Sequence, residues 1–239
     1  MIKYEIEGGN LPVVICYPEA NETLCTQSGA MSWMSPNMCM NTTSGGGFKK
    51  VLGRLISGES LFINEYTALG GAGMIAFAST FPGSIVPINL TYGEGIIVQK
   101  RAFLAMEKGL DISIYLQKKL GRGFFGGEGF FMQKISGEGT VFLEIDGYCK
   151  EYELSTNESI IVDTGYLAAM SDSCTMEIET VKGAKNMFLG GEGIFHTRIT
   201  GPGKVYIQSM PLVNTAHALT PYLNINNNSS DGINIKFGD

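Results

Sequence analysis

Histidine, the commonest catalytic base, is scarce in this sequence: the 239 residues include two, His196 and His217. Metal-dependent enzymes commonly need several histidines and a carboxylate that converge on one ion. Serine and cysteine nucleophiles also need a neighbouring base. The sequence contains no GxSxG, GxxxxGK[ST] or HExxH motif. We interpret His196 as a partly buried, hydrogen-bonded side chain, and we expect no enzyme activity, no metal and no cofactor.

A basic and aromatic segment is the strongest candidate for a partner or ligand surface. It combines three cations with two phenylalanines beside glycines: Lys118, Lys119, Arg122, Phe124 and Phe125. Cations next to aromatic rings suit an anionic membrane surface or single-stranded nucleic acid. The alternative is a contact between subunits, or a solvated loop with its rings tucked in.

Two sets of glutamates could form a carboxylate cluster. They are Glu22, Glu94 and Glu158 in one set, and Glu59, Glu128 and Glu192 in the other. Each is expected at a turn that enters a strand, where a carboxylate can accept backbone N–H groups. We therefore interpret both sets as structural, and ligand binding in grooves between repeated units is the alternative.

The five cysteines do not predict a disulfide or metal framework. Their number is odd and no two form a CxxC pair: Cys16, Cys25, Cys39, Cys149 and Cys174. We expect reduced, mostly buried thiols in a cytosolic protein. The segment 1–9 does not have the form of a signal peptide, and the longest apolar stretch, 74–78, is much shorter than a membrane span. These features predict a cytoplasmic location.

Charge and composition narrow the class of partner. The formal net charge is −6 and the sequence pI is about 5.0, so nucleic acid is not an expected partner. The chain has 32 glycines but 8 prolines, which favours many tight turns between short strands.

A threefold internal repeat is the clearest pattern in the sequence. A glutamate and a methionine lie twelve residues apart in three places, at 22–34, 94–106 and 158–170. Apolar runs of four to six residues bounded by glycine or asparagine predict strands, while 48–55 and 114–120 suggest one or two helical turns each. We predict an all-β chain of three tandem repeats packed together. The expected divisions are 1–90, 91–154, 155–221 and a tail with a hairpin at 222–239.

A repeat of about 65 residues buries too little surface to be stable alone. Tandem copies are therefore expected to pack edge to edge, which covers strand edges that would otherwise aggregate. The two ends of the array remain open, and joining copies of the chain head to tail would close a ring. We expect a homo-oligomer whose number of copies this argument does not determine.

Several segments resemble the AIM-type family, the bacterial relatives of the altered-inheritance-of-mitochondria protein. They are the stretch 22–34, the stretch 49–60 and the Gly-Gly-Glu-Gly boxes at 126–129 and 190–193, and the resemblance extends over about residues 1–222. It implies three repeats similar to the tryptophan RNA-binding attenuation protein (TRAP-like), each a short double-stranded β-helix or sandwich. It also implies homotrimers that form rings of nine such units, without established catalytic residues.

Together these observations favour a non-catalytic, ring-forming scaffold or interaction protein with a peripheral contact to a membrane surface. The alternative is a ring that binds a small molecule or RNA between its repeats. The mitochondrial relative is linked to inner-membrane organisation, but this sequence shows no transit peptide, so that role is not expected to transfer.

Overall fold

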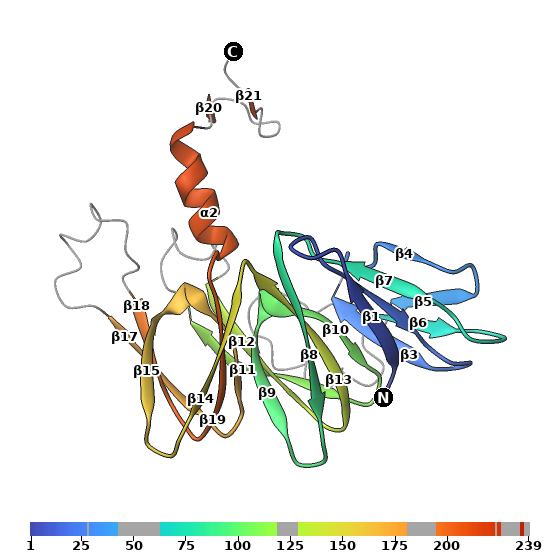
Figure 1. Ribbon diagram of the computed structural model, residues 1–239, viewed down its shortest axis with the longest axis horizontal. Helices are drawn as coiled ribbons and strands as arrows, with labels where there is room; N and C mark the ends of the chain where they lie inside the picture. Colours follow the sequence, from blue (N-terminus) through green and yellow to red (C-terminus); the bar gives the residue numbers. More distant parts are fainter. Residues whose placement is uncertain are drawn as a thin grey trace.

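The computed structural model describes residues 1–27, 29–42, 63–118, 129–180, 195–222, 224–225 and 235–236. In these residues the chain is mostly antiparallel β-structure, with one short α-helix, α2 (Leu212–Leu219). The prediction of a β-rich fold is confirmed at this level. Figure 1 shows the sheets following one another across the molecule, with the helix projecting from one side.

Four sheets make up the body of the described chain, and neighbouring strands within each sheet are hydrogen-bonded. Sheet 1 consists, in spatial order, of β1 (Lys3–Glu7), β2 (Val13–Tyr17), β7 (Ile75–Ala78) and β4 (Trp33–Met34). Sheet 2 consists of β5 (Met38–Thr42), β6 (Ile63–Ala68), β3 (Thr23–Gln27), β10 (Phe103–Glu107), β13 (Gly139–Asp146) and β8 (Gly83–Leu90). Sheet 3 consists of β11 (Asp111–Lys118), β12 (Phe130–Ser136), β9 (Gly95–Gln99), β16 (Leu167–Ser171), β19 (Gly203–Gln208) and β14 (Cys149–Leu154). Sheet 4 consists of β15 (Ser159–Asp163), β18 (Phe195–Thr200) and β17 (Thr175–Thr180).

Smaller elements complete the described chain. Three short 3₁₀ helices are η1 (Lys100–Ala102), η3 (Thr164–Tyr166) and η5 (Thr220–Tyr222). Near the C-terminus, β20 (Asn224–Ile225) pairs antiparallel with β21 (Ile235–Lys236).

Sheets 2 and 3 have the same order of strands, shifted by six strand numbers. Three successive sets of strands, β2–β7, β8–β13 and β14–β19, therefore pair internally in the same way. In the second set, β8 and β10 pair with β13, while β9 and β11 pair with β12. Neighbouring sets join through two further pairs, β3 with β10 and β9 with β16. The sequence repeat gives the number of residues between equivalent positions, but it does not show where one unit ends and the next begins. The strand pairing groups the strands into sets that begin at β2, β8 and β14.

The joins explain why each six-stranded sheet contains half of one set and half of the next. Sheet 4 carries the first half of this pattern, β17-β18-β15, at one end of the chain. Sheet 1 carries the second half, β4-β7-β2, at the other end and adds β1. The two end sheets are therefore complementary halves of one complete sheet.

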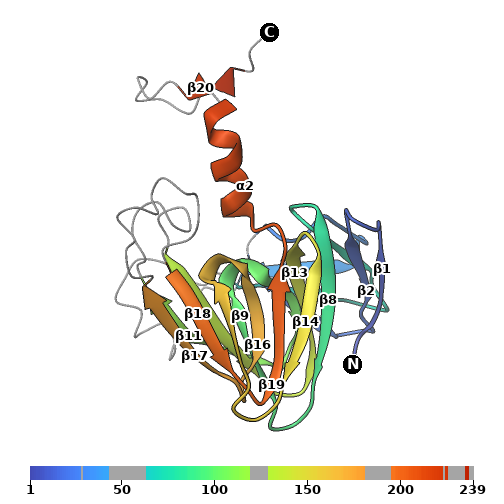
Figure 2. The ribbon, with the colours of Figure 1, turned by 60° about the vertical axis from the view of Figure 1, so that its left-hand side comes forward.

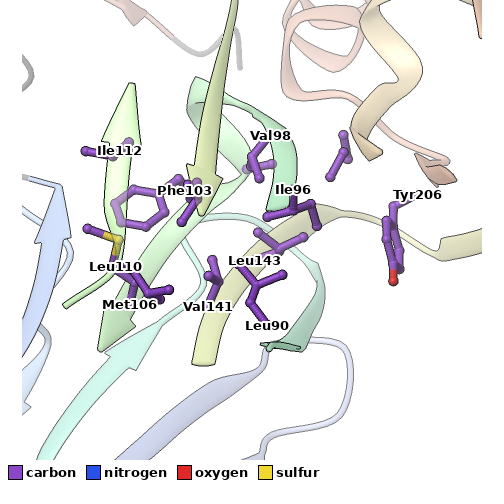
Figure 3. Close-up of a cluster of buried hydrophobic side chains, with 14 of the residues drawn as sticks. Leu90, Ile96, Val98, Phe103, Met106, Leu110, Ile112, Val141, Leu143 and Tyr206 are labelled. Atoms are coloured by element: carbon purple, nitrogen blue, oxygen red, sulfur yellow. The ribbon is translucent and has the colours of Figure 1, made fainter. Parts of the chain in front are cut away.

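Three apolar clusters lie between successive sheets. The middle cluster joins sheet 2 to sheet 3 and includes Phe103, Met106, Val141, Ile96 and Val98. Figure 3 shows side chains of both sheets gathered in it. A second cluster lies between sheets 1 and 2, and a third between sheets 3 and 4. In Figure 2, sheet 3 lies between sheets 2 and 4. Because apolar clusters also lie on both faces of sheet 2, its strand β13 is buried along its whole length.

One local prediction was wrong, and one element was not predicted. Residues 114–120 suggested helical turns, but Asp111–Lys118 forms β11 and pairs with β12. The helix α2 was not predicted, because its eight residues lay within the expected third repeat. It starts after Pro211, and the Asp146 carboxylate accepts a hydrogen bond from the Leu212 N–H at 2.8 Å. A carboxylate at this end is favourable because the first N–H groups of a helix lack intrahelical partners.

Candidate functional site

The predicted basic and aromatic surface lies mostly outside the described residues. Lys118 is the last residue of β11, where it is paired with Phe130. Lys119, Arg122, Phe124 and Phe125 fall in the undescribed stretch 119–128. Their role as a partner or ligand surface stays a prediction.

The two histidines lie on different elements. His196 is half-buried in β18, with Asp163 and Glu179 as its Cα partners on the two neighbouring strands. His217 is exposed on α2. Across the described ranges, no group of three or more His, Cys, Asp or Glu side chains is placed to hold a metal ion.

All five cysteines are free thiols, and Cys16, Cys25 and Cys174 are buried. Burial, with a smaller contribution from the Glu107 carboxylate, raises the pKa of Cys16 to about 12. Burial also raises the pKa of Cys25 and of Cys149 to about 11. A thiol with such a pKa stays protonated near neutral pH, and the thiol form is a poor nucleophile.

The first set of glutamates supports the structural interpretation made from the sequence. Each accepts a hydrogen bond at 2.8 Å from the backbone N–H three residues before it: Glu22 from Glu19, Glu94 from Thr91 and Glu158 from Ser155. The residue before each glutamate has a positive φ, at Asn21, Gly93 and Asn157. The three turns are therefore the same. The second set, Glu59, Glu128 and Glu192, lies outside the described residues.

The strongest candidate for an interaction site in the described chain is a pair of open strand edges. In the described residues, β4 ends sheet 1 with β7 as its neighbour, and β15 ends sheet 4 with β18 as its neighbour. The corresponding strands of the other sets are paired on both sides, because β10 and β16 each join the preceding set. Figure 1 places β4 and β15 at opposite ends of the molecule.

Side chains on these two strands are exposed where their counterparts are buried. Ile161 on β15 is 51% exposed, whereas its counterparts in the other sets, Ile97 and Cys25, are at most 3% exposed. Trp33 on β4 is 45% exposed, whereas its counterparts Ala105 and Ala169 are fully buried. The following set covers Cys25 and Ile97, and the preceding set covers the two alanines. Ile161 and Trp33 belong to the end sets and lack that cover in the described chain.

Ion pairs mark the two joins between sets. The Lys108 ammonium lies 3.0 Å from a Glu65 carboxylate oxygen at the first join. At the second join the polarity is reversed, and the Lys134 ammonium lies 2.9 Å from an Asp172 carboxylate oxygen. Arg198 occupies the position in the third set that corresponds to Glu65 and Lys134, and it pairs with Glu179 at 3.2 Å.

Comparison with known proteins assigns the chain to a family. The family described as mitochondrial biogenesis AIM24 matches residues 4–210. The chain belongs to this family. An uncharacterized protein of Streptococcus pyogenes serotype M6 is 30% identical over 226 residues, which cover 91% of this chain and 89% of that protein. An X-ray crystal structure of a Streptococcus pyogenes protein is similar with a TM-score of 0.76 at 28% identity, and the match covers 93% of this chain and all of that one.

These matches confirm the family resemblance seen in the sequence. They do not assign an activity, because the similar Streptococcus pyogenes protein is itself uncharacterized. No helix in the described part of this AIM24-family chain has the length and apolar character needed to cross a membrane.

Sequence reasoning did not single out Trp33 and Ile161, the exposed apolar residues of the two open edges. The signal was present, because the repeat alignment places a tryptophan where the other copies have alanine. Its meaning depends on knowing which strands end a sheet, and the strand order shows this.

Proposed function

We propose that this AIM24-family chain is a non-catalytic scaffold whose copies join head to tail into a closed ring. Each strand set is a TRAP-like repeat, and β15 of one copy pairs with β4 of the next. The single observation that carries this proposal is that sheets 4 and 1 are the two complementary halves of the complete sheets 2 and 3. Three copies, the number that the family resemblance implies, give a ring of nine repeats.

The two internal joins supply the geometry for the join between copies. At the first, Cys25 is paired with Met106, and at the second, Ile97 is paired with Met170. The same register pairs Ile161 of one copy with Met34 of the next. Ile161 would then be buried as Cys25 and Ile97 are, and its exposed apolar surface would be removed from water.

Closing the ring also covers the open β4 edge of sheet 1 and the open β15 edge of sheet 4. An unpaired strand edge carries free backbone donors and acceptors and is a template for uncontrolled pairing. One outer strand of sheet 2 and one of sheet 3 are protected in other ways: β8 contains Pro87, which cannot donate a backbone hydrogen bond, and β14 carries Lys150, Glu151 and Glu153. β4 and β15 have no proline, and the one charged residue among their seven, Asp163, lies at the end of β15. This contrast supports pairing of the two strands.

The mass of the full-length chain in solution tests the proposal. Light scattering over a range of micromolar concentrations should give a single species of about three chain masses. A monomer across that range would overturn the proposal.

The surface that the scaffold contacts is a separate part of the proposal. The segment Lys118–Phe125 is proposed to bring the ring to the cytoplasmic face of an anionic membrane. Flotation with vesicles that contain anionic lipid, compared with neutral vesicles, tests this contact. Binding that is equal for both vesicle types, or selective binding of an oligoribonucleotide instead, would contradict it.

A further inference from the structure

Each join between strand sets carries one large and one small side chain at the same two positions. In the second and third sets, the strand at the join has an alanine and its inner neighbour has an aromatic residue. In the first set the order is reversed. The three cross-strand pairs are Ala105 with Phe142, Ala169 with Tyr206, and Trp33 with Ala76.

The two internal pairs cover the core of the preceding set. Ala105 and Phe142 belong to the cluster between sheets 1 and 2, which is the core of the first set. Ala169 and Tyr206 belong to the cluster between sheets 2 and 3, which is the core of the second set. Tyr206 is visible at the margin of that cluster in Figure 3. In both joins the aromatic ring is at most 5% exposed.

Trp33 occupies the corresponding position in the first set, before which the described residues hold no further set. Its side chain is 45% exposed, which is unusual for the largest apolar side chain of a β-rich protein. The core of the third set, between sheets 3 and 4, contains Val162, and the described residues hold no set that follows it. The exposed Trp33 and this last core thus belong to the first and last sets of the described chain.

We infer that Trp33 of one copy covers the third core of the neighbouring copy by packing beside Val162. This inference rests on the proposed ring and names the side chain that completes its closing join. In the register of the internal joins, Trp33 lies opposite Val162, as Ala105 lies opposite Thr26 and Ala169 opposite Val98. The reversed order of the Trp33–Ala76 pair keeps one aromatic side chain and one alanine at each of the three kinds of join.

The closing join depends on the Trp33 side chain more than the internal joins depend on Phe142 and Tyr206. At the internal joins, the backbone N–H groups of Lys108 and Asp172 donate to Thr23 and Gly95 at 3.0 Å. The corresponding residue at the closing join is Pro36, which has no N–H to donate. The Lys108 and Asp172 side chains also form the ion pairs of the internal joins, and a proline cannot replace them. Apolar contact therefore contributes a larger share of the affinity at the closing join than at the internal joins.

Because Trp33 is the single tryptophan of the chain, intrinsic fluorescence reports on this site alone. The test uses the unmodified full-length protein, with emission wavelength and acrylamide quenching measured beside light scattering. We expect blue-shifted emission and weak quenching in the assembled protein. An assembled ring with red-shifted, readily quenched emission would overturn the inference and leave the proposed ring intact. A monomer at all concentrations would overturn both.

Two variants test the exchange of large and small side chains. Trp33→Ala should weaken assembly at least ~10-fold, as expected for the loss of a buried aromatic anchor. Combining Trp33→Ala with Ala76→Phe recreates the order found at the other joins and should restore assembly. Thermal unfolding of each variant checks that the chain is folded. Assembly by Trp33→Ala at wild-type affinity, or a folded double variant without rescue, would contradict the inference.

Discussion

Replacing Ile161 with aspartate should open the ring without unfolding the chain. The side chain is 51% exposed in the single chain, so the carboxylate of Ile161→Asp would be solvated there. In the closing join it would lie opposite Met34 and enter the apolar cluster between sheets 1 and 2 of the neighbour. The variant therefore separates the stability of the chain from the stability of the assembly.

The magnitude follows from two contributions. Burying the exposed half of an isoleucine side chain is worth about 1 kcal/mol, since full burial is worth about 1.5–3 kcal/mol. Transferring the carboxylate from water into the join costs several kcal/mol, of which its cross-strand neighbour Arg198 offsets a part, leaving a cost of about 3 kcal/mol. Because each 1.4 kcal/mol is about tenfold in affinity, the dissociation constant of each join should rise about 10³-fold or more.

Sedimentation velocity at micromolar concentration measures the effect directly. The wild-type chain should sediment as the closed assembly and Ile161→Asp as a monomer with an unchanged melting temperature. Ile6→Asp is the matched control, because Ile6 is also an exposed isoleucine on a strand but lies on β1, away from the closing join. Assembly by Ile161→Asp, or an equal loss of assembly in the control, would refute the reasoning.

Three further predictions concern stability and reactivity. The hydrogen bond from the Thr91 N–H lowers the pKa of Glu94, so the stabilisation that it gives is present above the unfolded pKa and is lost as pH falls through the folded pKa. Glu94→Gln should therefore lower the free energy of unfolding at pH 7 but not at pH 2. An equal effect at both pH values would contradict this. Lys108→Glu reverses one charge of the ion pair at the first join and should lower the melting temperature by a few degrees, because an exposed pair is worth about 0–1 kcal/mol and a like-charge contact adds repulsion. Adding Glu65→Lys should recover most of the loss. No recovery would argue against the ion pair. Because Cys16 is buried and its pKa is about 12, iodoacetamide at pH 8 should leave it unlabelled in the folded protein over a time that labels the urea-unfolded chain fully. Equal labelling of the folded and unfolded chains, measured by mass spectrometry, would show that Cys16 is not buried.

Short-range chemistry made much of the fold predictable. The twelve-residue spacing and the glycine-bounded apolar runs indicated repeated strands, and the turn at Glu22 recurs at Glu94 and Glu158 with the same hydrogen bond. A carboxylate that accepts a backbone N–H three residues earlier is a local requirement, and the sequence therefore displays it directly.

Tertiary contacts decided what the sequence did not show. Residues 112–116 do alternate in strand fashion, at Ile112, Ile114 and Leu116, so the expectation of helical turns at 114–120 rested on the wrong period. Pairing with β12 holds the segment as a strand. The helix α2 depends on a carboxylate from β13, 66 positions earlier in the sequence. Such distant partners are invisible to a local pattern.

The candidate site was missed for a related reason. Trp33 and Ile161 resemble ordinary core residues of a strand, and their exposure follows from the ends of the sheet order. The basic segment drew attention because its composition differs from that of the repeat. An open edge within the repeat has no such compositional mark.

Hydrogen–deuterium exchange on β4 and β15 tests the central claim most directly, because it follows the backbone groups that would join two copies. In the assembled wild-type protein, the outward-facing amides of Ser159–Asp163 should exchange slowly, as those of an inner strand do. In Ile161→Asp they should exchange fast while the rest of sheet 4 stays protected. Fast exchange at β15 in the assembled protein would show that copies associate elsewhere and would contradict the account.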